Sequence, residues 1–450
     1  MSLTYGYGRV KGALHEERGM ACEDAVGMWC DARRGLYVGV VADGHGDSTC
    51  VRSAVGAQLA VDVAIERLKG HAGGIDAREL ADVAKDMVRE WKRRVLADLS
   101  ERPIGQDEIG NVDLAVIEQW RMKHPAHLYG ATLVAMLLTR EYCAFIQQGD
   151  GCCALMQADG ALVYPVPEDE MCVGNLTTSL SDDDAEERIR YCGISLSENR
   201  ILGCFVASDG VEKSYVSREH LDAFFRDAVI EAQQKRTEEL CTVLTKNLAE
   251  VSKHGSRDDS SLACVVECKL ASASVDYLRR MNDRLRMRYE LTETRDKLVS
   301  MSRKHDMLEE QWRRGDGDVA QEYTAYHAAW QDLVQRERTL VEQISAIDEA
   351  SDDVRIGELE STESDAHGLV DEDESTEILP EQQPPSEEPP RRAASTEPSS
   401  DEAAEPSNVP SAPCRAGAGT RIVWLLVGLI VVLVSACGVW ILLSLLPAPS

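Results

Sequence analysis

The stretch LYVGVVADGHGD (Leu36–Asp47) joins the pattern of a buried strand to a polar turn that begins at a carboxylate. The run from Leu36 to Ala42 contains three valines and no charge, which favours extended backbone. It ends at Asp43, and the Asp-Gly pair there is typical of a turn. The pattern predicts a rigid sheet that carries an acidic side chain at its edge.

Other apolar runs predict further strands, and longer amphipathic stretches predict helices between them. The predicted strands are Leu36–Ala42, Ala131–Thr139, Glu141–Gln148, Ile201–Ser208 and Ser261–Leu270. The predicted helices span about 51–68, 77–99 and 112–123, and the second has apolar residues at three- and four-residue steps. Residues 1–270 therefore predict one domain of mixed helices and strands.

Three more acidic side chains lie beside predicted strands. Asp150 follows the strand 141–148, Asp209 follows the strand 201–208, and Asp258 precedes the strand 261–270. Carboxylates and carbonyls without His or Cys favour Mg²⁺ or Mn²⁺ over zinc. Any single Asp-Gly pair is most often only a turn. The hypothesis of a metal site therefore rests on the four acids together.

The motifs that contain these acids are similar to those of a known enzyme family. In chain order they read HEERGMACEDAV (15–26), VADGHGD (41–47), GATLVAML (130–137), QQGDG (147–151), ASDGV (207–211) and GSRDDSSLACVV (255–266). This series resembles the metal-dependent protein Ser/Thr phosphatases of type 2C, in the form common among bacterial members. The resemblance covers about 60 % of the chain, from Gly6 to Leu270. It implies an α+β fold, a four-layer α-β-β-α sandwich around two antiparallel sheets.

The resemblance also implies the cofactor, two Mn²⁺ or Mg²⁺ ions at one edge of the sheets. Carried over by motif, Asp43 bridges both ions and the Gly44 carbonyl binds one of them. Asp209 and Asp258 hold the other ion. Two ions a few ångströms apart acidify a bridging water, and the hydroxide attacks the phosphoryl group in line.

Four other residues receive roles from the same motifs. Glu23 is expected to bind metal mainly through water, and Asp150 is expected to help bind a weaker third ion. His45 is expected to protonate the departing alkoxide, since an imidazole titrates near neutral pH. Arg18 is the nearest candidate for gripping the substrate phosphate, although it lies about one residue farther from Glu23 than is usual.

The chain departs from the family pattern at several positions. The acid that normally follows the Asp209-Gly210 pair is missing or replaced by Glu212, because the sequence there reads DGVEK (209–213). Gly151 replaces a more usual Ser, and Asp259 stands where Asn is common. Pro165–Gly193 lies where family members carry a flap; its acids either favour basic phosphopeptides or form a solvated loop.

Because these departures leave the principal ligands in place, we expect a membrane-tethered protein serine/threonine phosphatase that acts on phosphoserine and phosphothreonine proteins. Two alternatives stay open. One is a catalytically silent phosphatase-like membrane scaffold that acts through its coiled segment. The other is a structural tether in which that segment carries the whole function.

The composition excludes a peptide or a single small module and disfavours nucleic acid as a partner. The chain has 450 residues, with 48 Lys and Arg against 78 Asp and Glu, for a formal charge of -30. No secretory signal is evident at the N-terminus, so we expect the 14 Cys to be reduced and to serve mainly as small core residues. A zinc or disulfide framework is the less favoured alternative.

The segment 271–350 is highly charged and helical in pattern, with apolar positions in two seven-residue frames broken at Gly315 and Gly317. An antiparallel helical hairpin is favoured over a long parallel dimer coil or a solvated helix, and a coiled-coil partner or self-association is expected. Residues 351–420 are acidic and hold nine of the 15 Pro, which predicts a disordered linker.

Ile422–Leu446 comprises about 25 residues without a charge, enough to cross a bilayer. Only four residues follow it, while Arg415 and Arg421 precede it on the side where excess basic residues mark the cytosol. We therefore expect a single-pass C-terminal anchor, 422–446, with the catalytic domain in the cytoplasm.

Overall fold

The computed structural model describes residues 3–71, 73–110, 112–172, 176–197, 200–233, 235–315 and 317–366. The strands are β1 Leu3–Val10, β2 Ala25–Asp31, β3 Leu36–Ala42, β4 Leu133–Leu138, β5 Tyr142–Gln148, β6 Cys152–Gln157, β7 Leu162–Val163, β8 Arg190–Ser195, β9 Ile201–Ala207 and β10 Ser260–Glu267. The α-helices are α1 Ala13–Arg18, α2 Ser53–Leu68, α3 Ala77–Glu101, α4 Leu114–Lys123, α5 Ala185–Arg188, α6 Asp209–Glu212, α7 Arg218–Ala232, α8 Thr237–His254, α9 Cys268–Arg313 and α10 Ala320–Ala366. Short 3₁₀ helices span Pro125–Tyr129 (η1) and Gly317–Val319 (η2).

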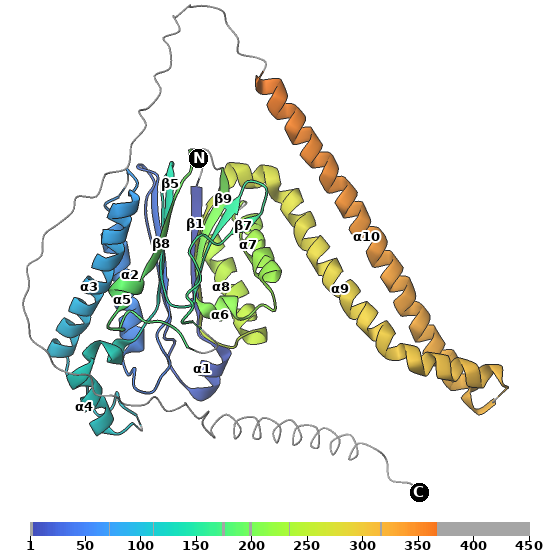
Figure 1. The fold of residues 1–450 in the computed structure, drawn as a ribbon, viewed down its shortest axis with the longest axis horizontal. Helices are drawn as coiled ribbons and strands as arrows, with labels where there is room; N and C mark the ends of the chain where they lie inside the picture. Colours follow the sequence, from blue (N-terminus) through green and yellow to red (C-terminus); the bar gives the residue numbers. More distant parts are fainter. Residues whose placement is uncertain are drawn as a thin grey trace, which may run out of the picture. The chain divides into compact units, whose positions relative to one another are not determined.

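These elements form two antiparallel sheets with helices on both outer faces (Figure 1). One sheet has the order β1-β10-β9-β6-β7 and the other has the order β2-β3-β4-β5-β8. Helices α2 and α3 cover the second sheet, and α7 and α8 cover the first. A third apolar cluster fills the space between the sheets. The α+β class and the expected pair of antiparallel sheets are confirmed.

The central strands lack polar alternation because each sheet is covered on both faces. In β3 the side chains of Val38 and Val40 join the cluster under α2 and α3, while Tyr37 and Val41 join the cluster between the sheets. Every residue of β3 is buried. An apolar run of this kind is expected for a strand with an apolar layer on each side.

Helices α2 and α3 pack through apolar residues, and those of α3 are the ones whose three- and four-residue spacing predicted the helix. Met87, Trp91 and Val95 of α3 are buried in the cluster under β3. The Trp91 indole donates a hydrogen bond to the Gly56 carbonyl of α2, over 2.9 Å. These contacts fix the helical layer behind the strand that ends at Asp43.

Arg52 is the last residue of the segment that links β3 to α2. Its guanidinium, 6 % exposed, donates to the Glu108 carboxylate over 2.6 and 2.8 Å and to the Tyr129 hydroxyl over 2.7 Å. It also lies 3.2 Å from the Asp98 carboxylate, which accepts from Tyr129. A buried charge with this many partners holds the following helix and the preceding turn in one arrangement.

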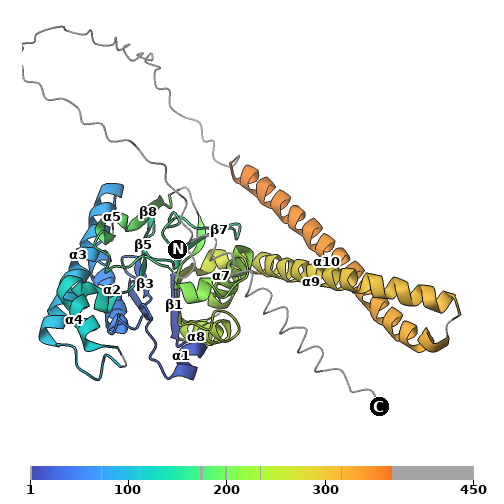
Figure 2. The ribbon, with the colours of Figure 1, turned by 60° about the horizontal axis from the view of Figure 1, so that its bottom comes forward.

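Helices α9 and α10 lie antiparallel to each other, in yellow and orange in Figures 1 and 2. Ion pairs cross between them, from Arg295 to Glu337 over 2.8 Å and from Arg336 to Glu290 over 2.7 Å. Leu340 is fully buried in the pair. The arrangement is a helical hairpin within one chain.

The hairpin differs in its limits from the predicted segment 271–350. Helix α9 begins at Cys268, so the predicted boundary at residue 270 falls inside it. Its first turns pack on the sheet domain: Leu278 is fully buried, and the Asn282 amide donates to the Ala223 carbonyl and to Asp227 of α7. The early turns of α9 therefore complete the core around α7.

At its other end α10 runs to Ala366, past the predicted start of the linker at residue 351. The prediction was wrong for residues 351–366, because this stretch contains no proline that would end the helix. The remainder of the predicted linker, 367–420, lies outside the described residues.

The predicted membrane span, 422–446, also lies outside the described residues. Among the helices that the structure does describe, none combines the length and the apolar character needed to cross a membrane.

Replacing Arg52 by Met should lower the free energy of unfolding by about 3 kcal/mol, because Asp98 and Glu108 would lose their buried cation. The matched control is Arg121→Met, whose half-exposed ion pair with Glu118 is expected to contribute less than about 1 kcal/mol. Urea unfolding of both variants measures the difference, and equal losses would contradict the role given to Arg52.

The same network makes the stability of the fold depend on pH. The hydrogen bond from Arg52 lowers the pKa of Glu108 below its ordinary 4.5. A carboxylate with a lowered pKa stabilises the fold above the pKa of the unfolded chain, and this stabilisation is lost as pH falls through the folded value. The stability difference between wild type and Arg52→Met should therefore shrink below about pH 4.5, and a constant difference would contradict the assignment.

Candidate metal centre

The acids predicted from the motifs converge where the two sheets end side by side. Asp43 follows β3, Asp209 begins α6 directly after β9, and Asp258 lies just before β10. Asp209 and Asp258 both lie near enough to Asp43 to raise its pKa, and the Asp209 carboxyl group is within hydrogen-bonding reach of Asp43. The structure therefore brings together three side chains that are separated by more than 200 residues of sequence.

Asp43 is held by an extension of the β3–β4 ladder. Its backbone N–H donates to the Thr132 hydroxyl over 2.9 Å, and its carbonyl accepts from the Thr132 N–H over 2.8 Å. Gly44 follows in a place without room for a side chain, because a Cβ there would lie 2.8 Å from the Glu23 carbonyl oxygen. The chain can thus pass close to the carboxylates with its backbone alone.

Glu23 is placed by Asp259, which sequence reasoning treated only as an extra charge. One Asp259 oxygen accepts from the Glu23 N–H and the other accepts from the Gly12 N–H, both over 2.6 Å. The ring of His15 lies 3.0 Å from Asp259 and 3.8 Å from Asp258. Asp259 is almost fully buried, so these contacts tie the N-terminal segment to the start of β10.

The neighbouring Asp24 is a further acid of the site that the sequence analysis did not assign. Its side chain is buried and accepts from the Ser261 hydroxyl over 2.7 Å. Its place beside Glu23 was a misleading signal, because consecutive residues entering a strand point to opposite sides. Only the fold shows that Asp24, at the edge of β2, faces the same cluster as Asp43 and Asp209.

Burial and mutual repulsion raise the pKa of four of these acids, Glu23, Asp24, Asp43 and Asp258. Burial is the main cause for Asp43, whose pKa lies well above its ordinary range, and Asp24 and Asp209 add to the shift. Burial also raises the pKa of Asp24 to about 7, and the pKa values of Glu23 and Asp258 rise for the same reason. Such a group of acids is costly in its ionised form unless cations neutralise it.

The donor atoms fit divalent cations. Among the described residues, Glu23 Oε2, Asp24 Oδ1 and Asp209 Oδ1 are buried oxygens without a hydrogen-bond donor. Buried carboxylate oxygens are normally paired, and unpaired ones indicate a missing partner. Oxygen ligands without sulfur or imidazole are those that Mg²⁺ and Mn²⁺ prefer.

Asp150 differs from these acids because protein donors use both of its oxygens. The Thr177 hydroxyl donates to Oδ1 over 2.7 Å, and the Lys213 ammonium donates to Oδ2 over 2.9 Å. Lys213 also contacts Asp209 Oδ2 over 2.5 Å. Burial would lower the pKa of Lys213, but Asp209 and Asp150 raise it above its ordinary value, so the ammonium stays charged.

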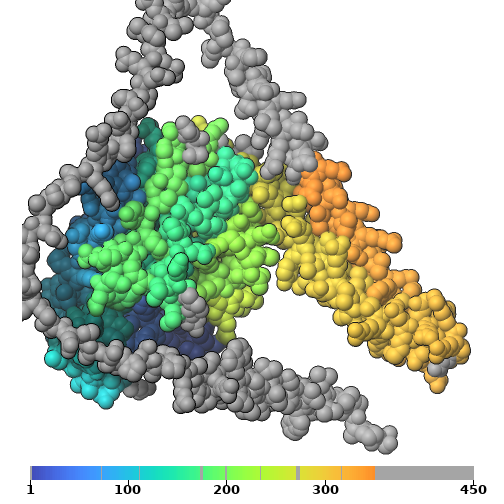
Figure 3. Space-filling model, viewed as in Figure 1, coloured from blue at the N-terminus to red at the C-terminus, as the bar shows by residue number. Residues whose placement is uncertain are grey.

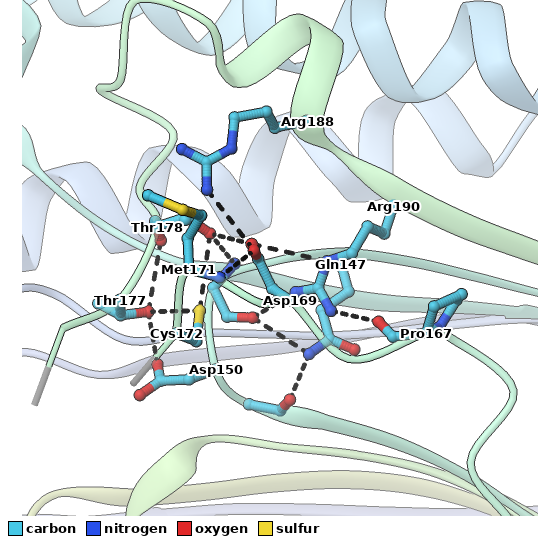
Figure 4. Close-up of polar contacts among 12 residues, drawn as sticks. Gln147, Asp150, Pro167, Asp169, Met171, Cys172, Thr177, Thr178, Arg188 and Arg190 are labelled. Carbon is cyan, nitrogen blue, oxygen red and sulfur yellow. Dashed lines mark hydrogen bonds and ion pairs between the residues drawn. The ribbon is translucent and has the colours of Figure 1, made fainter. Parts of the chain in front are cut away.

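Thr177 belongs to the flap segment, residues 165–189 between β7 and β8, of which 173–175 are not described. Figure 4 shows its polar contacts around Asp169. The Asp169 carboxylate accepts from the Met171 N–H over 3.0 Å and from the Thr178 hydroxyl over 2.9 Å, and Arg188 and Arg190 lie 3.5 and 3.9 Å away. Described residues of the flap segment lie at the surface of the molecule, in the green area of Figure 3.

A cavity of about 420 Å³ opens between the flap segment and the start of α7. Asp150 and Lys213 line it, together with Arg190 and Arg218. Acidic groups balance these cations, since Arg218 pairs with Glu212 over 2.8 Å. The cavity therefore places charged groups of both signs beside Asp150.

His45 and Arg18 occupy different settings. His45 is half-buried against Gly130, where an added Cβ would lie 2.6 Å from the ring, and burial lowers the pKa of its imidazole. Arg18 is exposed at the end of α1, and no hydrogen bond or ion pair within the described residues joins it to the acids. His15 of the same helix contacts Asp258 instead.

Comparisons with solved structures give distant likenesses. A bacterial serine phosphatase is 11 % identical, covers 59 % of this chain and 98 % of its own, and has a TM-score of 0.39. The phosphatase Stp1 from Staphylococcus aureus is 11 % identical (59 % and 96 % covered, TM-score 0.39). The catalytic domain of PstP, solved with two manganese ions, is 15 % identical (59 % and 97 %, TM-score 0.36). A search of curated proteins finds no match.

The family comparison covers more than half of the chain. Residues 11–251 match the family model described as protein phosphatase 2C. The matched range begins before the N-terminal segment held by Asp259 and includes Asp43, Asp150 and Asp209. Enzymes of this family use Mn²⁺ or Mg²⁺, in agreement with the oxygen ligands described above. The chain belongs to the protein phosphatase 2C family.

Proposed function

We propose that this chain is a metal-dependent protein serine/threonine phosphatase that hydrolyses phosphoserine and phosphothreonine in proteins. The observation that carries the proposal is the group of carboxylates around Asp43, with buried, unpaired oxygens on Glu23 and Asp209. Asp43 and the Gly44 carbonyl, with Asp209, Asp258 and, through water, Glu23, are the proposed metal ligands.

Two bound ions would supply an acidified water and neutralise the phosphoryl oxygens. The chain's own residues would fix the geometry. Thr132 holds the backbone of Asp43, and Asp259 holds that of Glu23, so the main chain that carries each carboxylate is fixed. Preorganised ligands of this kind reduce the cost of assembling the site for each substrate.

The proposed acid is His45, which would donate a proton to the departing serine or threonine oxygen. Its backbone N–H donates to the Gly130 carbonyl over 3.0 Å, which fixes the residue two positions after Asp43. Arg18 is the proposed phosphate-binding residue, since it ends the helix whose His15 lies 3.8 Å from Asp258. An exposed guanidinium can reach a phosphate without losing an internal partner.

Asp43→Asn should lower phosphate release from a phosphothreonine peptide by about 1000-fold or more, because the proposed bridging ligand loses its charge. The measurement uses the full chain in mild detergent with Mn²⁺, and EDTA should abolish the wild-type activity. Asp62→Asn, which alters an exposed carboxylate of α2, is the matched control and should stay active. No release by folded wild-type protein would instead favour the silent scaffold.

We also propose that the segment 422–446 anchors the protein in a membrane, with the catalytic domain in the cytoplasm. The support is its sequence, about 25 residues without a charge, preceded by Arg415 and Arg421. The acidic and proline-rich region before it would act as an extended tether.

In cells, the full chain should sediment with membranes and resist extraction by alkaline carbonate, because a spanning helix is held by its apolar surface. A chain ending at residue 420 should appear in the soluble fraction and keep its phosphatase activity, since the whole proposed metal centre lies before α9. A full chain that carbonate extracts would contradict the anchor but not the enzyme.

A further inference from the structure

Lys213 places a fixed positive charge between two carboxylates of the metal centre. It follows α6 directly, and its backbone N–H donates to the Asp209 carbonyl over 2.7 Å. Residues four apart on a helix are neighbours, so the side chain lies over Asp209. The ammonium contacts Asp209 Oδ2 over 2.5 Å and Asp150 Oδ2 over 2.9 Å.

The two carboxylates differ in how many of their oxygens have a partner. Asp209 uses Oδ2 for the ammonium and keeps Oδ1 unpaired, so Oδ1 is free to bind a metal ion. Asp150 has no such oxygen, because Thr177 donates to Oδ1 over 2.7 Å (Figure 4). An ion shared by Asp150 and Asp209 would have to displace Lys213. The residues present therefore do not fit the third ion that the family resemblance assigned to Asp150.

We propose that Lys213 is a built-in cation that replaces a third metal ion in this chain. Its ammonium neutralises Asp150 and one oxygen of Asp209, so the chain binds two ions where the family pattern would allow three. Asp150 then serves as a positioning residue that joins Thr177 of the flap segment to Lys213. This inference rests on the proposed function, because it takes the remaining carboxylates as ligands of two ions.

The replacement has a structural consequence. A metal ion at this place would leave when chelated, whereas an ammonium on the chain stays. Thr177, Asp150, Lys213 and Asp209 are joined by direct contacts between their own side chains. The flap segment is therefore linked to Asp209 by groups that belong to the chain.

The test measures manganese bound per chain, using the full protein stripped with EDTA and dialysed against MnCl₂. Wild type should bind two ions. Lys213→Asp should bind three, the third more weakly, because the substitution removes the ammonium, frees both Oδ2 atoms and adds a carboxylate. Lys213→Met should also gain weak binding of a third ion. The matched control is Lys235→Met. Lys235 also pairs with an acid four residues earlier in the chain, Glu231, over 2.5 Å, and this variant should bind two ions.

Three ions in wild type, or two in both Lys213 variants, would overturn the proposal. If circular dichroism shows that Lys213→Asp is unfolded, the wild-type count and the count for Lys213→Met together decide. Phosphate release from the same wild-type samples separates the two hypotheses. An active enzyme that binds three ions would refute only the role of Lys213, whereas a protein that binds no manganese would refute this role and the proposed function together.

Discussion

Repulsion among closely spaced carboxylates is the constraint on which the site depends. Asp43 has Asp24, Asp209 and Asp258 around it, and each of them raises its pKa. A flexible chain would separate these charges, so a rigid frame has to hold them together. The frame consists of β3, β9 and β10, whose residues are buried throughout and whose ends carry the acids. Stability of the sheets thus offsets the cost of concentrating negative charge at their edge, and bound cations would reduce that cost further.

The frame also depends on contacts between distant parts of the sequence. Asp259 accepts from the backbone at Gly12 and Glu23, more than 230 residues earlier in the chain. β1 pairs with β10 along its whole length, so the first and last strands of the domain lie side by side. The position of Glu23 therefore depends on a residue at the other end of the domain. Contacts between residues this far apart in sequence carry a high loop-closure cost, so domains built on them fold more slowly than domains built on local contacts.

Local sequence features predicted much of this arrangement. The five predicted strands correspond to β3, β4, β5, β9 and β10, because a strand buried on both faces leaves an apolar run that is visible without knowing its neighbours. Contacts between residues that are far apart in the sequence leave no such pattern. Asp24, His15 and the hydrogen bonds of Asp259 became visible only when β1 and β10 were paired. The helix boundary at residue 351 was misplaced because charge alone does not end a helix when proline is absent.

Asp150 and Asp209 show why a motif does not determine a residue's role. Both follow buried strands, and both precede glycine, so their sequence patterns are alike. Their partners differ: Asp209 keeps one unpaired oxygen, whereas Thr177 and Lys213 occupy both oxygens of Asp150. A carboxylate oxygen that faces an ammonium is a poor ligand for a metal ion, because two cations at the same place repel each other. Lys213 forms an ion pair with both carboxylates, but only Asp209 keeps a second, unpaired oxygen and with it the character of a candidate metal ligand.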